Sequence, residues 1–462
     1  GLLAYLQIFT ILGFLSIANL GLGPAIIKYV AELSVVNDFN GISKMISSAF
    51  FTLLFIGIIV STLGLYFSNF IVNSLNVPNE KLIYFEKGFR LIFFTFIFIL
   101  PLSIFGNVLE GLQKYKIFKS LEAFLWIGYM TSAIYFSYIQ VSFEKIFSLF
   151  LLFQCLQHIL FFIFVQLYYR ENIIKISLFS LKSLKKIFKM GKYFTLMGIF
   201  GIITKNLEKL IIGIYLSPLF ISYYEIIFKI PNVLKNIFSW LDTVIIPITS
   251  EFSIKGKFNS LANLFSITLN IKTIILYPLL VFLLIFIKDI IRIWISHEYV
   301  FLSKYIQILL LWNVIIPLSN HGSKYLIGLN KILDKLMIYT LVSNMLKIFI
   351  IIMLIESHEL LAIVFGYLSL ILPTPIMFSF ICKEVKVSKR KIYKNMIIAI
   401  IISSFIILAP YFINLIYTIS VLELFFLITI YFLVTYYIIT KIILKINLLH
   451  LPRIFLRMQN VN

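Results

Sequence analysis

The sequence contains few acidic residues, few charged residues of any kind and almost no cysteine. Only 13% of its 462 residues are charged, whereas 61% are hydrophobic and the mean hydropathy is +1.03, values that exclude an ordinary soluble domain. The two cysteines, Cys155 and Cys382, lie in or at the end of apolar stretches and are too few for a disulfide framework, so we expect them to serve packing. The chain is therefore predicted to be a multi-pass membrane protein.

The sequence also lacks the motifs of enzymes. It has no G-x-x-x-x-G-K-[ST] phosphate loop, no pair of histidines at metal-ligand spacing and no evident cluster of a nucleophile with a base. The predicted outer loops are short, with 288–305 among the longest, whereas a membrane glycosyltransferase or polymerase is expected to carry a large outer loop. We predict that the protein is not an enzyme and holds neither a cofactor nor a metal.

Long apolar runs are abundant. Thirteen of them are long enough to cross a hydrocarbon core of about 30 Å. They cover residues 1–19, 45–67, 90–109, 120–139, 146–167, 192–216, 221–248, 262–287, 304–328, 336–355, 359–381, 395–414 and 420–440. Continuous runs of this length predict helices rather than the alternating strands of a membrane barrel. The predicted fold class is all-α.

The net charge of +21 would suggest a nucleic-acid partner for a soluble protein, but here the basic residues sort by membrane side. Most of the 40 Lys and Arg fall in alternate connections between spans if the first visible helix runs from outside to inside. The positive-inside rule favours that orientation in the cell (inner, cytoplasmic) membrane, with bilayer lipid rather than nucleic acid as the partner of these charges. No cleavable signal peptide is visible, and internal helices can direct insertion.

An internal repeat joins the two halves at an offset of 216 to 219 residues. The clearest match pairs Leu100-Pro101-Leu102-Ser103 with Ile316-Pro317-Leu318-Ser319. Further matches at this offset pair Tyr5 with Tyr223, Ile8 with Ile226, Glu32 with Glu251, Asn40 with Asn259, Gly106 with Gly322, Gly111 with Gly328 and Lys114 with Lys331. Repeats of this kind occur in transporters, with the substrate site between the copies.

The repeat predicts the organisation of the chain. The first copy lacks a counterpart of residues 192–216, so we expect a first transmembrane helix, roughly 30 residues with its flanks, to be missing. The copies would then each have six helices and be parallel, related by a pseudo-two-fold axis along the membrane normal. The predicted divisions are an N-lobe at 1–167, a basic linker at 168–191, a C-lobe at 192–382, and two additional helices with a basic tail at 383–462. The linker is either an amphipathic stretch resting on anionic lipid or a solvated loop.

Several motifs resemble those of a known family. They are GLLAY at 1–5, ANLGLGPAIIKYVAE at 18–32, NLEKLIIG at 206–213, SYYE at 222–225 and KIP at 229–231. In order and spacing they resemble the polysaccharide-biosynthesis (O-antigen) flippases of the Wzx type, over nearly the whole chain. Many members of that family carry Asp where this chain has Glu208.

The resemblance implies a fold shared with MATE multidrug exporters and lipid II flippases, in which two six-helix lobes form a V around a central cavity. It also implies transport of an undecaprenyl-pyrophosphate-linked oligosaccharide from the cytoplasmic to the outer leaflet, with glycan polymerase machinery as a further partner. Two alternatives stay open, a lipid II flippase and a cation-coupled MATE-type multidrug exporter. The exporter would require an acidic or aromatic cavity, whereas the candidate residues here are basic.

Basic residues inside the apolar spans are the candidates for the substrate site. Each costs about 2.5 to 3.5 kcal/mol at a helix centre on insertion scales, so a role must offset that cost. The candidates are Lys205, Lys209, Glu208, Lys229, Lys272, Lys28, Lys235, Lys324 and Lys347. Lysine suits a transient contact with pyrophosphate because its ammonium is a flexible point charge. No catalytic or metal-binding residue is predicted.

Each candidate also has a structural interpretation. Lys205, Glu208 and Lys209 share one helix face, where the carboxylate would hold a phosphate-binding geometry or simply neutralise a lysine. The same two interpretations apply to Glu225 with Lys229, whereas Lys235 could snorkel to an interface. Lys28, which follows Gly21, Gly23 and Pro24, could be an ordinary cytoplasmic anchor.

The direction of transport has an electrical source. An inside-negative potential favours outward movement of a pyrophosphate by about 2.3 kcal/mol per charge per 100 mV. Coupling to H⁺ or Na⁺ would add to this. The carboxylates considered for that coupling are Glu208, Glu225, Glu110, Glu122 and Asp242.

Overall fold

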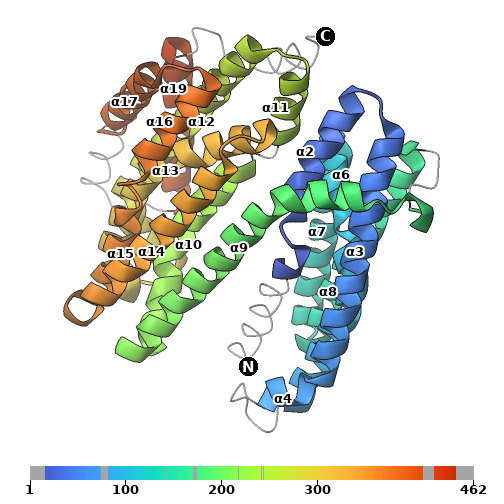
Figure 1. Ribbon diagram of the computed structural model, residues 1–462. Helices are drawn as coiled ribbons and strands as arrows, with labels where there is room; N and C mark the ends of the chain where they lie inside the picture. Colours follow the sequence, from blue (N-terminus) through green and yellow to red (C-terminus); the bar gives the residue numbers. More distant parts are fainter. Residues whose placement is uncertain are drawn as a thin grey trace. The chain divides into compact units, whose positions relative to one another are not determined.

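The computed structural model describes residues 16–73, 82–141, 143–169, 174–216, 218–240, 242, 244–408 and 421–443. Across these residues the regular elements are helices, as the sequence predicts (Figure 1). Packing divides the chain into two compact units. Unit 1 contains residues 1–202, 244–255 and 327–337, and unit 2 contains residues 203–243, 256–326 and 338–462.

Unit 1 is a bundle formed mainly by the first copy of the repeat. Its elements are η1 Ser16–Asn19, α2 Leu22–Val35, α3 Phe39–Tyr66, α4 Ser68–Asn73, α5 Leu82–Leu102, α6 Ile104–Gly111, α7 Tyr115–Tyr138, α8 Phe143–Tyr169, η3 Ile176–Leu178, the first part of α9 Leu181–Tyr215, and α11 Ile245–Ile254. Helix α3 packs along α5, α5 and α7 pack on α8, and α2 packs against α3, α6 and α11 (Figure 1). The predicted linker is therefore helical in its second half, and the Ser180 N–H donates to Ser48 Oγ of α3 at 2.9 Å.

A break before α2 brings backbones close together. Leu20 and Gly21 have φ values of 48° and 58°, in the left-handed region that favours glycine. A Cβ added at Gly21 would lie 2.6 Å from the Gly191 carbonyl oxygen of α9, and one at Gly191 would lie 3.1 Å from the Leu20 carbonyl oxygen. The two glycines thus allow α9 to contact the broken segment, which positions one wall of the pocket described below.

One contact in unit 1 shows the repeat in three dimensions. A Cβ added at Gly111 would lie 2.9 Å from Val30 Cβ, and one at Gly328 would lie 1.7 Å from Thr249 Oγ1. Gly111 corresponds to Gly328 in the repeat, and the offset that pairs Glu32 with Glu251 pairs Val30 with Thr249. The two copies therefore preserve the same close helix approach, α6 on α2 and the end of α13 on α11.

Unit 2 surrounds the long helix α12. Its elements are the second part of α9, α10 Pro218–Trp240, α12 Phe258–Trp294, η4 His297–Leu302, α13 Ser303–Leu329, α14 Leu333–His358, α15 Leu360–Ser369, α16 Thr374–Val385, α17 Lys389–Ile406 and α19 Val421–Ile443. Helices α16, α17 and α19 pack on α12, and the Tyr431 hydroxyl of α19 donates to the Pro278 carbonyl at 3.0 Å. The helices beyond the repeat thus belong to the core of unit 2.

Part of the chain forms helices with the length and composition of membrane spans. Within the described residues, six helical segments are long and apolar enough to cross a bilayer. They are Phe39–Tyr66, Glu86–Gly111, Lys145–Tyr169, Phe258–Trp294, Leu333–His358 and Leu360–Val385. Most of the first predicted span lies outside the described residues. The single span predicted at 221–248 is divided between α10, which ends at Trp240, and α11, which begins at Ile245. The other predicted spans follow helices that carry more polar or charged side chains or that extend into residues outside the described ranges.

The compact units are not the predicted lobes. Helix α9 runs without interruption from Leu181 to Tyr215, and unit 1 ends within it at Ile202. A repeat copy is a stretch of sequence, whereas a compact unit is defined by packing, so the lobe boundaries at 167, 191 and 382 stay predictions.

Candidate functional site

Glu208 is the centre of a buried cluster in unit 2. Its side chain is fully buried on α9, and its Oε2 accepts hydrogen bonds from the Tyr224 hydroxyl at 2.7 Å and the Tyr367 hydroxyl at 2.9 Å. Lys347 Nζ of α14 lies 2.5 Å from Oε1, in an ion pair rather than a directed hydrogen bond, and 4.6 Å from the centre of the Tyr367 ring. Because a buried carboxylate needs such partners, this cluster ties α9, α10, α14 and α15 together.

Exposed lysines flank the Glu208 cluster. Lys235 of α10 lies close enough to Lys205 and to Lys347 for each of their ammonium charges to repel its own. We call Lys205, Lys235 and Lys347 the lysine cluster. Lys205 and Lys235 are exposed and form no ion pair with any residue in the part of the chain that the structure describes, whereas Glu208 neutralises Lys347. Unit 2 thus presents excess positive charge on α9 and α10.

Two further candidate lysines lie near this cluster in the sequence but differ in their pairing. Lys209 forms an ion pair with Glu225 of α10 at 2.5 Å, and both side chains are substantially exposed. Lys229 is exposed and has no ion-pair partner within the described ranges. The predicted pairing of Glu225 with Lys229 is therefore replaced by a pairing between two helices, and Glu208 pairs with Lys347 rather than with Lys205 or Lys209.

A second ionic network lies in the core of unit 2. Asp242 occupies the turn between α10 and α11, Lys272 lies on α12 and His321 lies on α13, and all three are at most 3% exposed. Asp242 Oδ1 accepts from Lys272 Nζ and lies 2.8 Å from His321 Nδ1. The other ring nitrogen of His321 lies 2.9 Å from Thr268 Oγ1. Lys324, one turn along α13 from His321, is half-buried and has no ion-pair partner in the described residues.

Lys28 is paired within its own helix. The side chain is 3% exposed on α2 and forms an ion pair with Glu32 one turn later. Its ammonium also lies 4.3 Å from the centre of the Tyr29 ring, and the ammonium of Lys186 on α9 lies at the same distance from that ring. A cation over an aromatic face is stabilised by the ring quadrupole. Glu32 and the Tyr29 ring thus both stabilise the Lys28 ammonium in this conformation.

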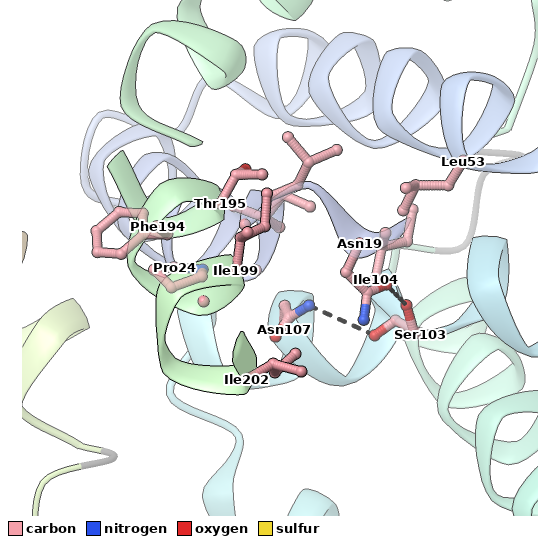
Figure 2. A pocket seen from close by; sticks show the side chains of 15 residues that line it. Asn19, Pro24, Leu53, Ser103, Ile104, Asn107, Phe194, Thr195, Ile199 and Ile202 are labelled. Carbon is pink, nitrogen blue, oxygen red and sulfur yellow. Dashed lines mark hydrogen bonds between the residues drawn. The ribbon is translucent and has the colours of Figure 1, made fainter. Parts of the chain in front are cut away.

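Unit 1 holds an uncharged pocket of about 250 Å³. Its fifteen lining residues come from η1, α2, α3, α6 and α9 and the turns beside them, and none of the fifteen carries a charge (Figure 2). The Ser103 hydroxyl donates to the Leu100 carbonyl at 2.7 Å and lies 3.3 Å from Asn19 Oδ1, and Asn107 Nδ2 reaches the Ser103 carbonyl at 3.5 Å. Within the described residues, no bond reaches Asn19 Nδ2 or Asn107 Oδ1. The pocket therefore offers free amide donors and acceptors.

The repeat places this pocket and the Asp242 network at equivalent positions. At an offset of 219, Asp242 corresponds to Gly23 and Lys272 to Leu53, and both Gly23 and Leu53 line the pocket. At the offset of 216 that pairs Ser103 with Ser319, His321 corresponds to Phe105, the neighbour of the lining residue Ile104. The first copy thus has small or apolar residues and an open pocket where the second copy has three ionisable side chains in contact.

The structure brings together some of the predicted site residues and separates others. Lys205, Glu208, Lys235 and Lys347 gather in unit 2, Lys272 lies in a different network of that unit, and Lys28 lies in unit 1. Four of the predicted lysines are paired with acids in the observed geometry, namely Lys28, Lys209, Lys272 and Lys347. Whether any of the nine candidates contacts substrate stays a prediction.

Sequence reasoning missed the tyrosines and the amides. Tyr224 and Tyr367 were not among the candidates because a tyrosine in an apolar helix has no distinguishing pattern, although Tyr224 lies directly before Glu225 in the SYYE motif. Asn19, Ser103 and Asn107 converge from segments more than 80 residues apart. The sequence signal that could have identified them is the repeat motif, which contains Ser103 and lies directly before Asn107.

The arrangement of helices is that of a known class of membrane transporter. The structure is similar to a MOP superfamily transporter from Pyrococcus furiosus, described as having a binding pocket of reversed polarity, with 13% identity, a TM-score of 0.70 and coverage of 83% of this chain and 87% of that chain. An outward-facing multidrug resistance MATE family transporter matches with 13% identity, a TM-score of 0.71 and coverage of 83% and 88%. An inward-facing one matches with 13% identity, a TM-score of 0.60 and coverage of 82% and 89%. The protein has the MATE-like transporter fold, which confirms the predicted fold class.

The family within that class follows from the sequence. Residues 1–304 match the family of polysaccharide biosynthesis proteins, and the chain belongs to that family. This confirms the resemblance stated from the motifs. No curated protein matches the sequence. The protein is thus a multi-pass membrane protein of the polysaccharide biosynthesis family, and its fold is similar to that of transporters of the MOP superfamily.

Proposed function

We propose that the protein is a flippase that moves an undecaprenyl-pyrophosphate-linked oligosaccharide from the cytoplasmic to the outer leaflet of the cell membrane. The family supports a polysaccharide-related substrate, and the fold supports transport across a bilayer. The observation that carries the proposal is the lysine cluster of unit 2. A pyrophosphate cannot cross hydrocarbon unaided, because burying an unpaired charge costs many kcal/mol, and exposed ammonium groups on transmembrane helices lower that cost.

The ion pairs in the structure indicate which candidate lysines are available to contact the pyrophosphate. Lys205 and Lys235 keep their positive charge uncompensated by an acid in the described residues, so we propose them as the first pyrophosphate contacts. Lys229 and Lys324, which are also without an acidic partner there, are the next candidates. Four candidate lysines form ion pairs that stabilise the fold in this conformation, namely Lys28, Lys209, Lys272 and Lys347. These lysines would bind substrate only if the ion pairs separate during transport.

Transport is proposed to proceed by alternating access, with the lipid tail remaining in the bilayer while the headgroup crosses a hydrated groove. The membrane potential supplies a direction, at about 2.3 kcal/mol per charge per 100 mV for an anionic headgroup. Coupling to H⁺ or Na⁺ is a further proposal, with Glu208 as the carboxylate best placed beside the lysine cluster. The glycan polymerase that would receive the product is proposed as a partner on the outer side.

Two rival functions share the fold. A lipid II flippase would also use lysines against a pyrophosphate, and it differs in the sugar and peptide of its cargo. A cation-coupled multidrug exporter would prefer cationic drugs, which the lysine cluster would repel. The uncompensated charge of Lys205 and Lys235 therefore favours an anionic cargo.

The test is a leaflet-accessibility assay in proteoliposomes that contain a fluorescent undecaprenyl-pyrophosphate oligosaccharide. Charge reversal of both Lys205→Glu and Lys235→Glu should lower the initial rate of translocation at least about tenfold, since the two contacts together contribute more than about 1.4 kcal/mol. Lys288→Glu, at an exposed lysine of α12 in the same unit, is the matched control and should leave the rate unchanged. Equal rates for the double variant and the wild type would remove the lysine cluster from the mechanism. No translocation by the wild type, together with export of a cationic dye, would support the exporter.

A further inference from the structure

We infer that the uncharged pocket of unit 1 is a binding subsite for one sugar ring of the transported headgroup. The inference rests on the proposed function, because its ligand is the neutral part of the proposed cargo. It concerns residues that were not among the predicted substrate-site candidates, namely Asn19, Ser103, Asn107 and Thr195.

The chemistry of the pocket matches a sugar and not a phosphate. Its fifteen lining residues include no Lys, Arg or His, although the protein carries a net charge of +21. The polar side chains among the described lining residues are two amides and two hydroxyls. Amides and hydroxyls both donate and accept hydrogen bonds, as the hydroxyls of a sugar do. A pyrophosphate offers acceptors alone, and the free acceptor Asn107 Oδ1 would face it without a donor.

The free hydrogen-bonding groups point to a ligand. Asn19 Nδ2 and Asn107 Oδ1 have no partner within the described residues, and the one bond from Asn107 Nδ2 is long, at 3.5 Å. Thr195 donates to the Gly191 carbonyl at 3.0 Å, which leaves the lone pairs of its hydroxyl oxygen available. Apolar side chains form the rest of the wall, including Phe194, Ile199 and Ile202 of α9 (Figure 2). Mixed walls of this kind suit a sugar ring, which has polar edges and apolar C–H faces.

The size of the pocket limits the ligand. A volume of about 250 Å³ lies just below the roughly 300–1,000 Å³ of sites that bury drug-sized molecules. The pocket therefore accommodates one ring and not a chain of several. It selects among sugars at a single residue of the cargo.

The second copy of the repeat explains why the pocket is specific to unit 1. Positions equivalent to the lining residues Gly23 and Leu53 hold Asp242 and Lys272 in unit 2, where the two side chains are in contact and buried. In the first copy a residue without a side chain and an apolar residue stand at these positions, and space remains. In the first copy, uncharged residues at these positions and a cavity thus occur together.

The test compares two lipids that differ only in the sugar. Purified full-length chain in nanodiscs is titrated with undecaprenyl pyrophosphate and with the same lipid bearing one sugar, taken from a panel of hexoses and N-acetylhexosamines. Two hydrogen bonds to a sugar contribute enough for the wild type to bind at least one member of the panel about tenfold tighter than the bare lipid.

A matched pair of glycines on α9 provides the variants. No heavy atom of the described residues lies within 4 Å of a Cβ added at Gly198 or at Gly201, so a larger side chain is tolerated at both, but of the two only Gly198 lines the pocket. Gly198→Leu should abolish the tenfold preference and leave binding of the bare lipid unchanged. Gly201→Leu should preserve the preference. Asn107→Leu, which keeps the branched shape of the side chain and removes its hydrogen bonds, should reduce the preference as well.

The outcomes separate this inference from the proposed function. A preference that survives Gly198→Leu, or the absence of a preference for every sugar in the panel, overturns the sugar subsite while binding of the bare lipid still supports a pyrophosphate carrier. Failure of the wild type to bind either lipid overturns both. Loss of bare-lipid binding in Gly198→Leu would show that the pocket holds the pyrophosphate instead.

Discussion

The two copies of the internal repeat preserve one packing contact and differ in chemistry at another set of equivalent positions. Gly111 against Val30 and Gly328 against Thr249 repeat the same close helix approach. Near the first pair lies an uncharged pocket with free amides, and at the equivalent positions of the second copy lies a buried network of Asp242, Lys272 and His321. Two helices can pack this closely only if the residue at the contact has no side chain, so the glycine is required. The polarity of side chains at other positions can change without moving the helices. One copy is thus neutral at these positions and the other is charged.

The largest effect is expected from a substitution in the buried charged network of the second copy. Asp242→Asn leaves the Lys272 ammonium buried without a countercharge, which should cost about 3–5 kcal/mol of unfolding free energy. The double variant Asp242→Asn with Lys272→Met should recover most of that loss, because no buried charge remains. Thermal unfolding in detergent, with protein yield from the membrane as a second readout, measures both. Similar losses in the single and the double variant would mean that the network stabilises through packing and not through charge.

A smaller effect is expected at the shared packing contact. Gly328→Ala should destabilise by about 1–3 kcal/mol because the new methyl group overlaps Thr249 Oγ1, and Gly111→Ala should cost less because its nearest contact is longer. The ratio of the two losses in unfolding experiments compares the copies directly. Equal losses would show that the two helix approaches relax to the same extent. Gly198→Ala, where no heavy atom lies within 4 Å, is the control and should not destabilise.

The Glu208 cluster should respond more mildly when one of its donors is removed. Tyr367→Phe deletes one of two hydroxyl donors to Glu208 Oε2 and keeps the ring beside Lys347, so the expected loss is about 1–2 kcal/mol. Tyr224→Phe, which removes the other donor, should cost a similar amount. Unfolding of the two single variants and the double variant measures the coupling between the bonds. Strictly additive losses would argue against a cooperative cluster.

The smallest effect is expected at the exposed ion pair of unit 2. Glu225→Gln removes the partner of Lys209, and since both side chains are substantially exposed, the change should stay below about 1 kcal/mol and vanish at high salt. Salt-dependent unfolding of this variant and of the wild type provides the measurement. A loss as large as that of Asp242→Asn would mean that exposure does not distinguish the two ion pairs.

Much of the fold could be predicted from periodicity and composition. The apolar runs predict helices because a bilayer requires every backbone hydrogen bond to be made within the segment, and the observed helices follow those runs. The repeat identified Gly111 and Gly328 as equivalent before their contacts were seen. The continuity of α9 across the predicted boundary near 191 was not predictable, because a basic stretch can be either a loop or the start of a helix.

The sequence predicted which types of residue form the candidate site, but not which residues pair with one another. The spacing predicted that Lys205 and Glu208 share one helix face, but Glu208 is buried and pairs with Lys347, which is 139 positions away in the sequence. Helical spacing reports neighbours within a helix and says nothing about which helix lies opposite. The same limit hid the tyrosine donors to Glu208 and the convergence of Asn19 with Ser103.

The sequence by itself determined that this protein is helical, membrane-spanning, duplicated and rich in lysines that must be offset, because each of these properties depends on composition or on regular spacing. The tertiary structure decided which lysines are neutralised, which remain exposed and where an uncharged pocket lies. The physical reason is that a buried charge is stabilised by whatever acid, hydroxyl or ring stands opposite it in space, and that neighbour is chosen by packing between helices.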